Sequence, residues 1–129
     1  MVGKYVPLTL EATARRIKAL GSEDAWICVR DFLDDWYAAD QITREKMLLD
    51  KPPETGDQKL DAYLAALAEY FAGHHGLAVP DWVYDSNRFL NQFWFPTSCQ
   101  SLHALALVQS PAAFRRRGIF IDSTEFLRC

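Results

Sequence analysis

The sequence predicts an all-α fold, mainly helical, and three observations lead to that prediction. Apolar residues recur at helical spacing, capping residues and glycines bracket those segments at short intervals, and no stretch shows the alternation of a half-buried strand. The chain has 129 residues, half of them hydrophobic, which is enough to bury one core. We therefore expect a compact single domain, residues 1–129, of about seven or eight helices, several of them short.

The first two predicted helices lie on either side of Gly21. Residues 10–20 fit a helix with Thr9 as its N-cap and Gly21 just past its end. Ser22 is placed to cap a second helix, with Glu23 and Asp24 in its first turn. The apolar residues of this second helix form one stripe that we expect to face the core, namely Trp26, Val29, Leu33, Trp36 and Tyr37.

A loop precedes the segment with the clearest helical pattern. Residues 43–50 fit a short helix, and two prolines and a glycine then predict a surface loop over residues 51–57. Asp57 opens the next helix, which residues 73–76 end. Its apolar stripe consists of Leu60, Leu64, Leu67 and Phe71, broadened by Tyr63 and Tyr70.

The remainder of the chain is predicted as a series of short elements. Pro80 suits the first position of a helical turn, Ser86 suits the cap of a segment whose apolar residues share one side, and Ser110 suits another N-cap. The expected elements are a turn at 80–84, a helix from 86 to 96 carrying Phe89, Leu90, Phe93 and Trp94, a helix at 102–108, a helix from 110 to 118, a short extended segment at 118–121 and a last turn at 122–125.

Charge is distributed unevenly along the chain, although the formal net charge is only −3. Residues 23–61 hold eleven carboxylates and five basic side chains, a local balance of −6. Residues 86–121 contain no acid and four arginines, a local balance of +4. Such a distribution can steer a charged partner, while a solvated acidic face and one basic turn would explain it as well.

Three groups of residues are candidates for binding a partner. Aspartates on the outer side of the second helix could take the place of phosphates in a basic cleft, an aromatic pair precedes Pro96, and a run of three arginines could contact an acidic patch or nucleic acid. The residues are Asp24, Asp31, Asp34 and Asp35, then Trp94 and Phe95, then Arg115, Arg116 and Arg117. For each group, the alternative is an ordinary structural role.

The sequence contains no pattern that identifies a catalytic centre. There is no phosphate-binding glycine loop, no nucleophile elbow and no zinc-ligand spacing, so we expect no catalytic residue, no metal and no cofactor. His74, His75, His103 and the three cysteines have no assigned role. The odd, widely spaced cysteines suggest reduced thiols, and no apolar stretch is long enough to span a membrane, so we expect a cytoplasmic protein.

Three strings in the chain have a familiar form, mostly in its C-terminal half. They are LDAYLAALAEYFAGHHGLAVPDWV, RFLNQFWFP and ALVQSPAAFRRRGIFID, beginning at residues 60, 88 and 106. They resemble a group of small bacterial proteins encoded beside nucleotidyltransferase-like toxins, an arrangement that suggests an antitoxin. The resemblance implies a non-catalytic protein that binds and restrains such a toxin, and it brings no catalytic residues with it.

Three functions therefore remain open from the sequence. The first is a protein-interaction module, the antitoxin that the resemblance implies. The second is a DNA-binding regulator that uses the basic turn at residues 115–117, although the aspartates on the second helix would repel DNA. The third is a small-molecule enzyme.

Overall fold

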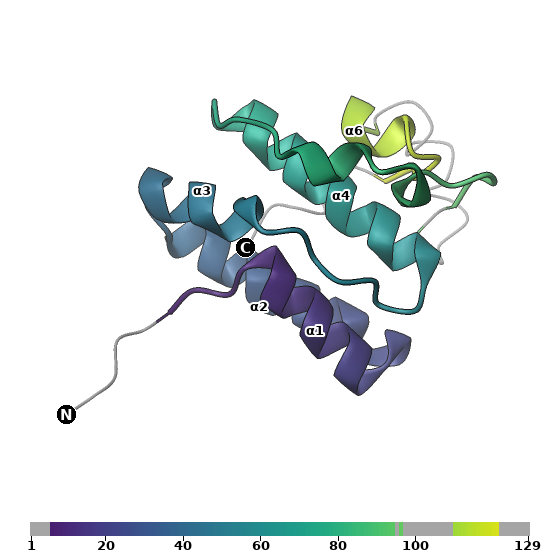
Figure 1. Cartoon of the computed structure of the whole chain (residues 1–129), viewed down its shortest axis with the longest axis horizontal. Helices are drawn as coiled ribbons and strands as arrows, with labels where there is room; N and C mark the ends of the chain where they lie inside the picture. The colour runs from purple at the N-terminus through teal and green to yellow at the C-terminus, as the bar shows by residue number, and fades with distance from the viewer. Residues whose placement is uncertain (1–5, 95, 97–109, 122–129) are drawn as a thin grey trace.

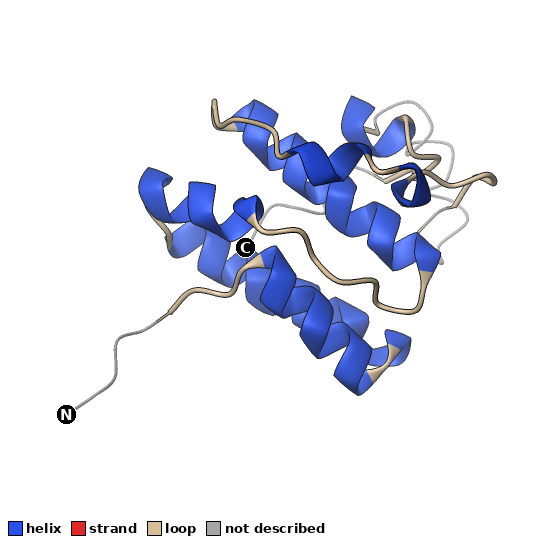
Figure 2. Ribbon diagram, viewed as in Figure 1, coloured by secondary structure: helices blue, strands red, loops and turns tan. Residues whose placement is uncertain are grey.

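The computed structural model describes residues 6–94, 96 and 110–121. Within these ranges the structure has five α-helices, three short 3-10 helices and no strand, so the all-α prediction is confirmed (Figure 2). The α-helices of this part are fewer than the seven or eight expected. The elements are α1 (Leu10–Leu20), η1 (Ser22–Asp24), α2 (Ala25–Ala38), α3 (Gln41–Leu49), α4 (Gln58–His74), η2 (Asp81–Tyr84), η3 (Ser86–Arg88) and α6 (Ala112–Arg115).

Helix α4 is the centre of the fold. The helices α1, α2 and α3 lie on one side of it, and η2, η3 and α6 lie on the other (Figure 1). The predicted stripe of large apolar residues is buried, and the alanines between them are buried too. A helix that contacts neighbours on several sides is apolar around most of its circumference, and the small alanine side chains allow those neighbours to approach.

Helix α1 begins and ends as predicted. The Thr9 hydroxyl accepts a hydrogen bond from the Ala12 N–H at 3.0 Å, and Gly21 follows the helix with φ +96°. The next prediction was wrong in detail, because residues 22–24 form η1 and α2 starts at Ala25 without a side-chain cap from Asp24. The Gly21 carbonyl accepts the N–H of Asp24, which draws these residues into a tighter turn.

The buried face of α2 is centred differently from the predicted stripe. Val29, Leu33 and Trp36 are buried as expected, but Trp26 is 39% exposed and Tyr37 is 38% exposed. The inner face also includes Ala25, Cys28 and Phe32. Ala25, Cys28 and Phe32 follow the i, i+3, i+4 spacing of one helix face and form the middle of the buried face of α2. Trp26 and Tyr37 therefore lie at the edges of that face.

The loop at residues 51–57 is not the simple surface excursion that its prolines suggest. Pro52 and Thr55 are buried. The N–H and hydroxyl of Thr55 both donate to Asp61 Oδ1, at 2.9 and 2.8 Å. The carbonyl of Pro52 accepts a hydrogen bond from Arg88 Nη2 at 2.8 Å, so the loop is fastened to both α4 and η3.

The expected helix from 86 to 96 is also corrected. Among the described residues of this range only Ser86–Arg88 is helical, and Phe89 then turns to extended backbone with φ −119° and ψ 130°. The N–H of Leu90 donates to Arg117 O and the N–H of Trp94 to Gly118 O, while Trp94 forms a parallel bridge with Ile119. Non-local partners thus replace the local helical hydrogen bonds in this segment.

The segment 110–121 is short and tightly folded. The Ser110 hydroxyl does not cap α6 as predicted but donates to Ile119 O at 3.1 Å, and Pro111 holds the N-cap position. Pro80 likewise holds the cap position of η2 rather than its first turn. The helix expected from 110 to 118 is shorter than predicted, since α6 ends at Arg115 with Arg116 as its C-cap, and Gly118, with φ +82°, belongs to the turn that follows. The helix expected at 102–108 and the turn at 122–125 lie outside the described residues.

Candidate functional site

The three adjacent arginines of the predicted basic turn have different environments. Arg117 is fully buried. Its Nη1 donates to Glu69 Oε1 at 2.6 Å and to Ala113 O at 2.8 Å, and its Nη2 donates to Val83 O at 2.7 Å. Its guanidinium also lies 4.6 Å from the centre of the Phe89 ring. These contacts tie α6 to α4 and η2, and they leave Arg117 unable to touch a partner.

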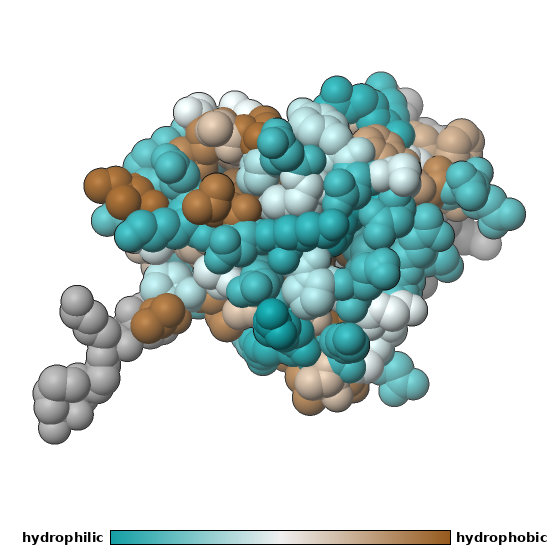
Figure 3. All heavy atoms as spheres, in the orientation of Figure 1, coloured by the Kyte–Doolittle hydropathy of each residue, from teal (hydrophilic) through white to brown (hydrophobic). Residues whose placement is uncertain are grey.

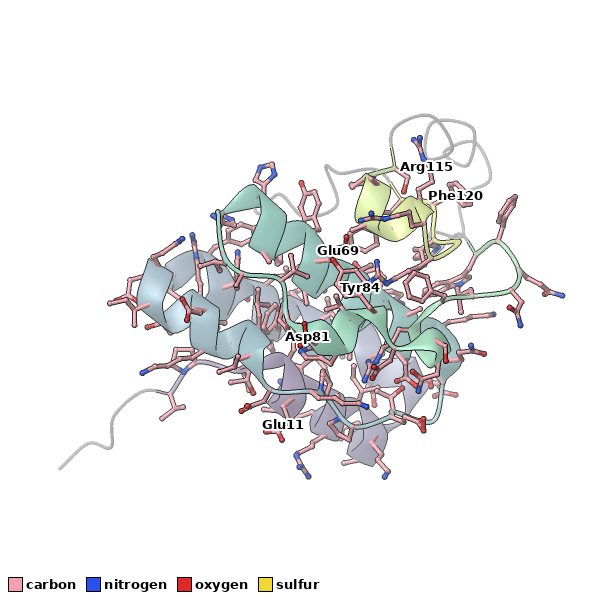
Figure 4. All side chains as sticks on the ribbon, turned by 45° about the horizontal axis from the view of Figure 1, so that its top comes forward. Glu11, Glu69, Asp81, Tyr84, Arg115 and Phe120 are labelled. Atoms are coloured by element: carbon pink, nitrogen blue, oxygen red, sulfur yellow. The ribbon has the colours of Figure 1, made fainter. Side chains whose placement is uncertain are left out.

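The other two arginines of the run are exposed. Arg116 forms an ion pair with Glu69 Oε2, so one carboxylate from α4 engages two consecutive arginines. Figure 4 shows Glu69 directed from α4 towards the α6 segment, with Arg115 on the outer side of that segment. The run therefore contributes two exposed side chains to the surface, and that of Arg116 is paired with a carboxylate.

A second buried arginine, Arg88, was not a candidate in the sequence. It is fully buried, with Nη1 on the carbonyl of Asp61 at 3.1 Å and its guanidinium 5.0 Å from the centre of the Trp82 ring. Burial lowers the pKa of Arg88 below its ordinary value, and Asp61 is the first of the carboxylates that counteract this effect. Arg88 stands alone in a stretch without acids, so the sequence did not indicate that its hydrogen-bond acceptors lie in other parts of the fold.

The four arginines of the acid-free stretch, residues 86–121, therefore do not all contribute to a basic surface. Two of its four arginines, Arg88 and Arg117, are interior. Their guanidinium groups are neutralised or hydrogen-bonded by groups that precede the stretch, above all Glu69. Phosphate contacts require side chains that reach solvent, and here only Arg115 and Arg116 do so.

Asp31 and Asp35, two of the four candidate aspartates, contact residues that precede α2. Asp31 pairs with Arg16 of α1 at 3.1 Å, and Asp35 Oδ2 accepts the N–H of Leu8 at 2.7 Å. Asp24 and Asp34 are exposed. Asp31 and Asp35 therefore hold α1 and the segment before it against α2.

Aromatic side chains from α2 and the segment after η3 meet at one edge of the molecule. We call Trp26, Phe93 and Trp94 the aromatic edge. The rings of Trp26 and Trp94 stack with centres 6.2 Å apart and planes 20° apart, and the buried Tyr63 meets both of them edge-on. Phe93 is 74% exposed and meets the ring of Phe120 edge-on, with ring centres 5.0 Å apart. Phe95, the other candidate here, lies outside the described residues.

An open hollow of about 410 Å³ lies beside the aromatic edge. The first turn of α4 forms one wall and residues 90–94 form the other. Lys59 places its ammonium group 6.0 Å from the centre of the Trp94 ring. Hydrogen bonds from both ends of the 90–94 segment to Arg117 and Gly118 hold the second wall in place. The hollow is a fixed, mixed polar and aromatic surface of the kind found at binding sites.

Elsewhere, exposed apolar side chains are more dispersed. Ile42 and Leu49 of α3 and Leu20 of α1 are each more than half exposed. Figure 3 shows a largely hydrophilic face on which the hydrophobic patches are separate from one another. Singly exposed apolar residues are usual on soluble domains and indicate no particular function.

The described ranges contain no cluster of three or more histidine, cysteine or acidic residues arranged to hold a metal ion. Cys28 is a buried free thiol in α2, and His74 and His75 lie at the end of α4. His103, Cys99 and Cys129 lie outside the described residues.

The fold defines a class of protein: an all-helical domain organised around a buried central helix. In comparisons with protein-family models, with curated proteins and with solved structures, nothing matches this chain. No helix in the described residues combines the length and the apolar character needed to cross a membrane.

Proposed function

We propose that this chain is a protein-interaction module that binds its partner through the aromatic edge. The observation that carries the proposal is the stacked pair of Trp26 and Trp94 beside the protruding Phe93, next to a hollow with fixed walls. Tryptophan is strongly enriched among the residues that dominate binding energy at protein interfaces. Both tryptophans are already held in place by Tyr63, so little conformational entropy is lost when a partner covers them.

The partner we propose is a nucleotidyltransferase-type toxin, which this chain would restrain as an antitoxin. Support for this partner comes from the three sequence strings described above, and one of them contains Phe93 and Trp94. A protein that blocks an enzyme needs a rigid surface rather than catalytic groups. The aromatic edge is such a surface, because it is built on α2 and on a segment pinned to residues 117–120.

The experiment that tests this proposal is purification of the tagged full-length protein from its native host, with identification of the proteins that accompany it. We expect a nucleotidyltransferase to accompany the wild-type chain. Trp26→Ala and Phe93→Ala should each reduce its recovery at least tenfold, the effect of losing about 1.4 kcal/mol or more of binding energy.

The control variant is Tyr84→Ala, which removes an aromatic residue that is 55% exposed but lies in η2, outside the aromatic edge. Its recovery should equal that of the wild type. Circular dichroism of each variant verifies that it folds. Equal recovery with all variants, or a companion protein of another class, would contradict the proposal.

A further inference from the structure

One side chain of α3 reaches across to both α2 and the end of α4. Arg44 donates from Nε to the carbonyl of Trp36 at 2.9 Å, and its Nη1 lies 3.3 Å from Nδ1 of His75. Its guanidinium lies 5.2 Å from the centre of the Trp36 ring. Gln41 adds a second link between the same elements, donating from Nε2 to the carbonyl of His75 at 2.7 Å. Figure 1 shows α3 beside this end of α4.

The contact between Arg44 and His75 is a hydrogen bond only when the histidine is neutral. A guanidinium has only donors, so Nδ1 of His75 must be the acceptor and carry no hydrogen. The imidazole is therefore neutral, with its hydrogen on Nε2. A doubly protonated ring would have no acceptor to offer and would place a second positive charge against Arg44.

The charged and titratable groups that face His75 favour its neutral form. From α3 the facing group is Arg44, from α4 it is the neighbouring His74, and α2 contributes the uncharged ring of Trp36, whose centre is 5.4 Å from that of His75. The pKa of His75 lies below the ordinary value of 6.5, first because the ring is partly buried and then because of Arg44 and His74.

We propose that His75 is a proton-sensitive latch: as a neutral acceptor it holds Arg44, and with it α3, against the end of α4, and its protonation releases α3. Arg44 and His75 both lie beside the ring of Trp36. Trp36 is fully buried and stacks on Phe71 with ring centres 4.6 Å apart. Release removes the contact of Arg44 with His75 and leaves the bond from Arg44 Nε to the Trp36 carbonyl and the bond from Gln41 to the His75 carbonyl as the side-chain links of α3 to α2 and α4.

The direction of the effect follows from proton linkage. With a lowered pKa in the folded chain, the unfolded chain takes up the proton first as the pH falls below 6.5. The contribution of the latch is therefore fully present above that pH and is lost progressively as the pH falls through the lowered pKa of the folded state.

Hydrogen exchange of the full chain at about pH 7.5 and about pH 5, corrected for the intrinsic pH dependence of exchange, tests the latch. The protection of α3 amides should fall severalfold more at the lower pH than that of α1 amides. His75→Asn keeps an acceptor near the position of Nδ1 but does not titrate, so it should abolish the α3-specific loss. His74→Asn, which changes the adjacent histidine that stacks on Tyr70, should keep it.

A second measurement covers the case in which His75→Asn fails to fold. In Arg44→Gln the NMR titration midpoint of the His75 ring should move upward, since a positive neighbour is gone, and α3 should be poorly protected at both pH values. Equal pH responses of α3 and α1 in the wild type, an α3-specific loss that persists in His75→Asn, or an unchanged midpoint in Arg44→Gln would each overturn the proposal.

Discussion

At the scale of single residues, neighbours in the sequence have unrelated roles in the structure. Arg117 is interior and Arg115 is exposed, although both belong to one basic run. Asp31 and Asp35 of α2 secure α1 and the segment before it, whereas Asp24 of η1 is exposed and makes no cap bond to α2. The chemical type of a side chain indicates what it can bind, and its partners decide whether that group is available.

Arg117 supplies the sharpest prediction at this scale. Arg117→Met should lower the free energy of unfolding by about 3–5 kcal/mol, because it leaves the nearly buried Glu69 without its buried cation and removes the bond to Val83. Arg115→Met, a change to the exposed neighbour, should cost no more than about 1 kcal/mol. Urea denaturation of the three proteins measures both values.

A double variant separates the ion pair from the packing around it. Arg117→Met combined with Glu69→Leu removes both charges, so it should be more stable than Arg117→Met alone. Equal and small losses in the free energy of unfolding for Arg117→Met and Arg115→Met would contradict the role of Arg117 in holding α6 to α4.

At the scale of elements, turns determine which segments meet. Gly118 adopts φ +82°, and this turn brings residues 117–120 alongside residues 90–94. A Cβ atom on Gly118 would lie 3.3 Å from the carbonyl oxygen of Gln92. The wall of the hollow beside the aromatic edge therefore depends on the absence of a side chain at this position.

Gly118→Ala and Gly73→Ala should change stability in opposite directions. Alanine at 118 is strained by its positive φ and crowded by Gln92, so we expect a loss of about 1–3 kcal/mol. Gly73 lies within α4, and a Cβ atom there would meet no neighbour within 4 Å, so alanine should add about 0.4–1 kcal/mol. Thermal unfolding of both variants measures the two shifts, and shifts of the same sign would contradict this assignment.

At the scale of the whole molecule, α4 joins the two halves of the fold. Its side chains contact Trp36 of α2 through Phe71, and they contact Phe114 of α6 through Tyr63. The ion pair of Glu69 and the bond from Arg88 to Asp61 O attach the C-terminal elements to the same helix. Neither half can bury its apolar surface without α4.

This shared helix predicts that the chain unfolds as one domain. Far-ultraviolet circular dichroism, which follows the helices, and tryptophan fluorescence, which follows side chains on both sides of α4, should give coincident two-state transitions in urea. Two separated transitions would show that the halves are independent and that the single-domain prediction is wrong.

What the sequence determined by itself is local. The all-α class, the bounds of α1 and the N-cap of α4 all follow from periodicity and capping, which act within a few residues. The same local logic assigned a helix to residues 89–94, and there it was wrong.

The tertiary structure alone decided how distant residues are used. It extended residues 89–94 against Gly118, buried Arg88 and Arg117, moved Trp26 to the edge of the core and set His75 against Arg44. Each of these outcomes depends on a partner far away in the sequence, whether a carboxylate, a carbonyl or a ring. Periodicity and caps report only a residue's preference for a local conformation, whereas burial and charge pairing depend on which elements pack together.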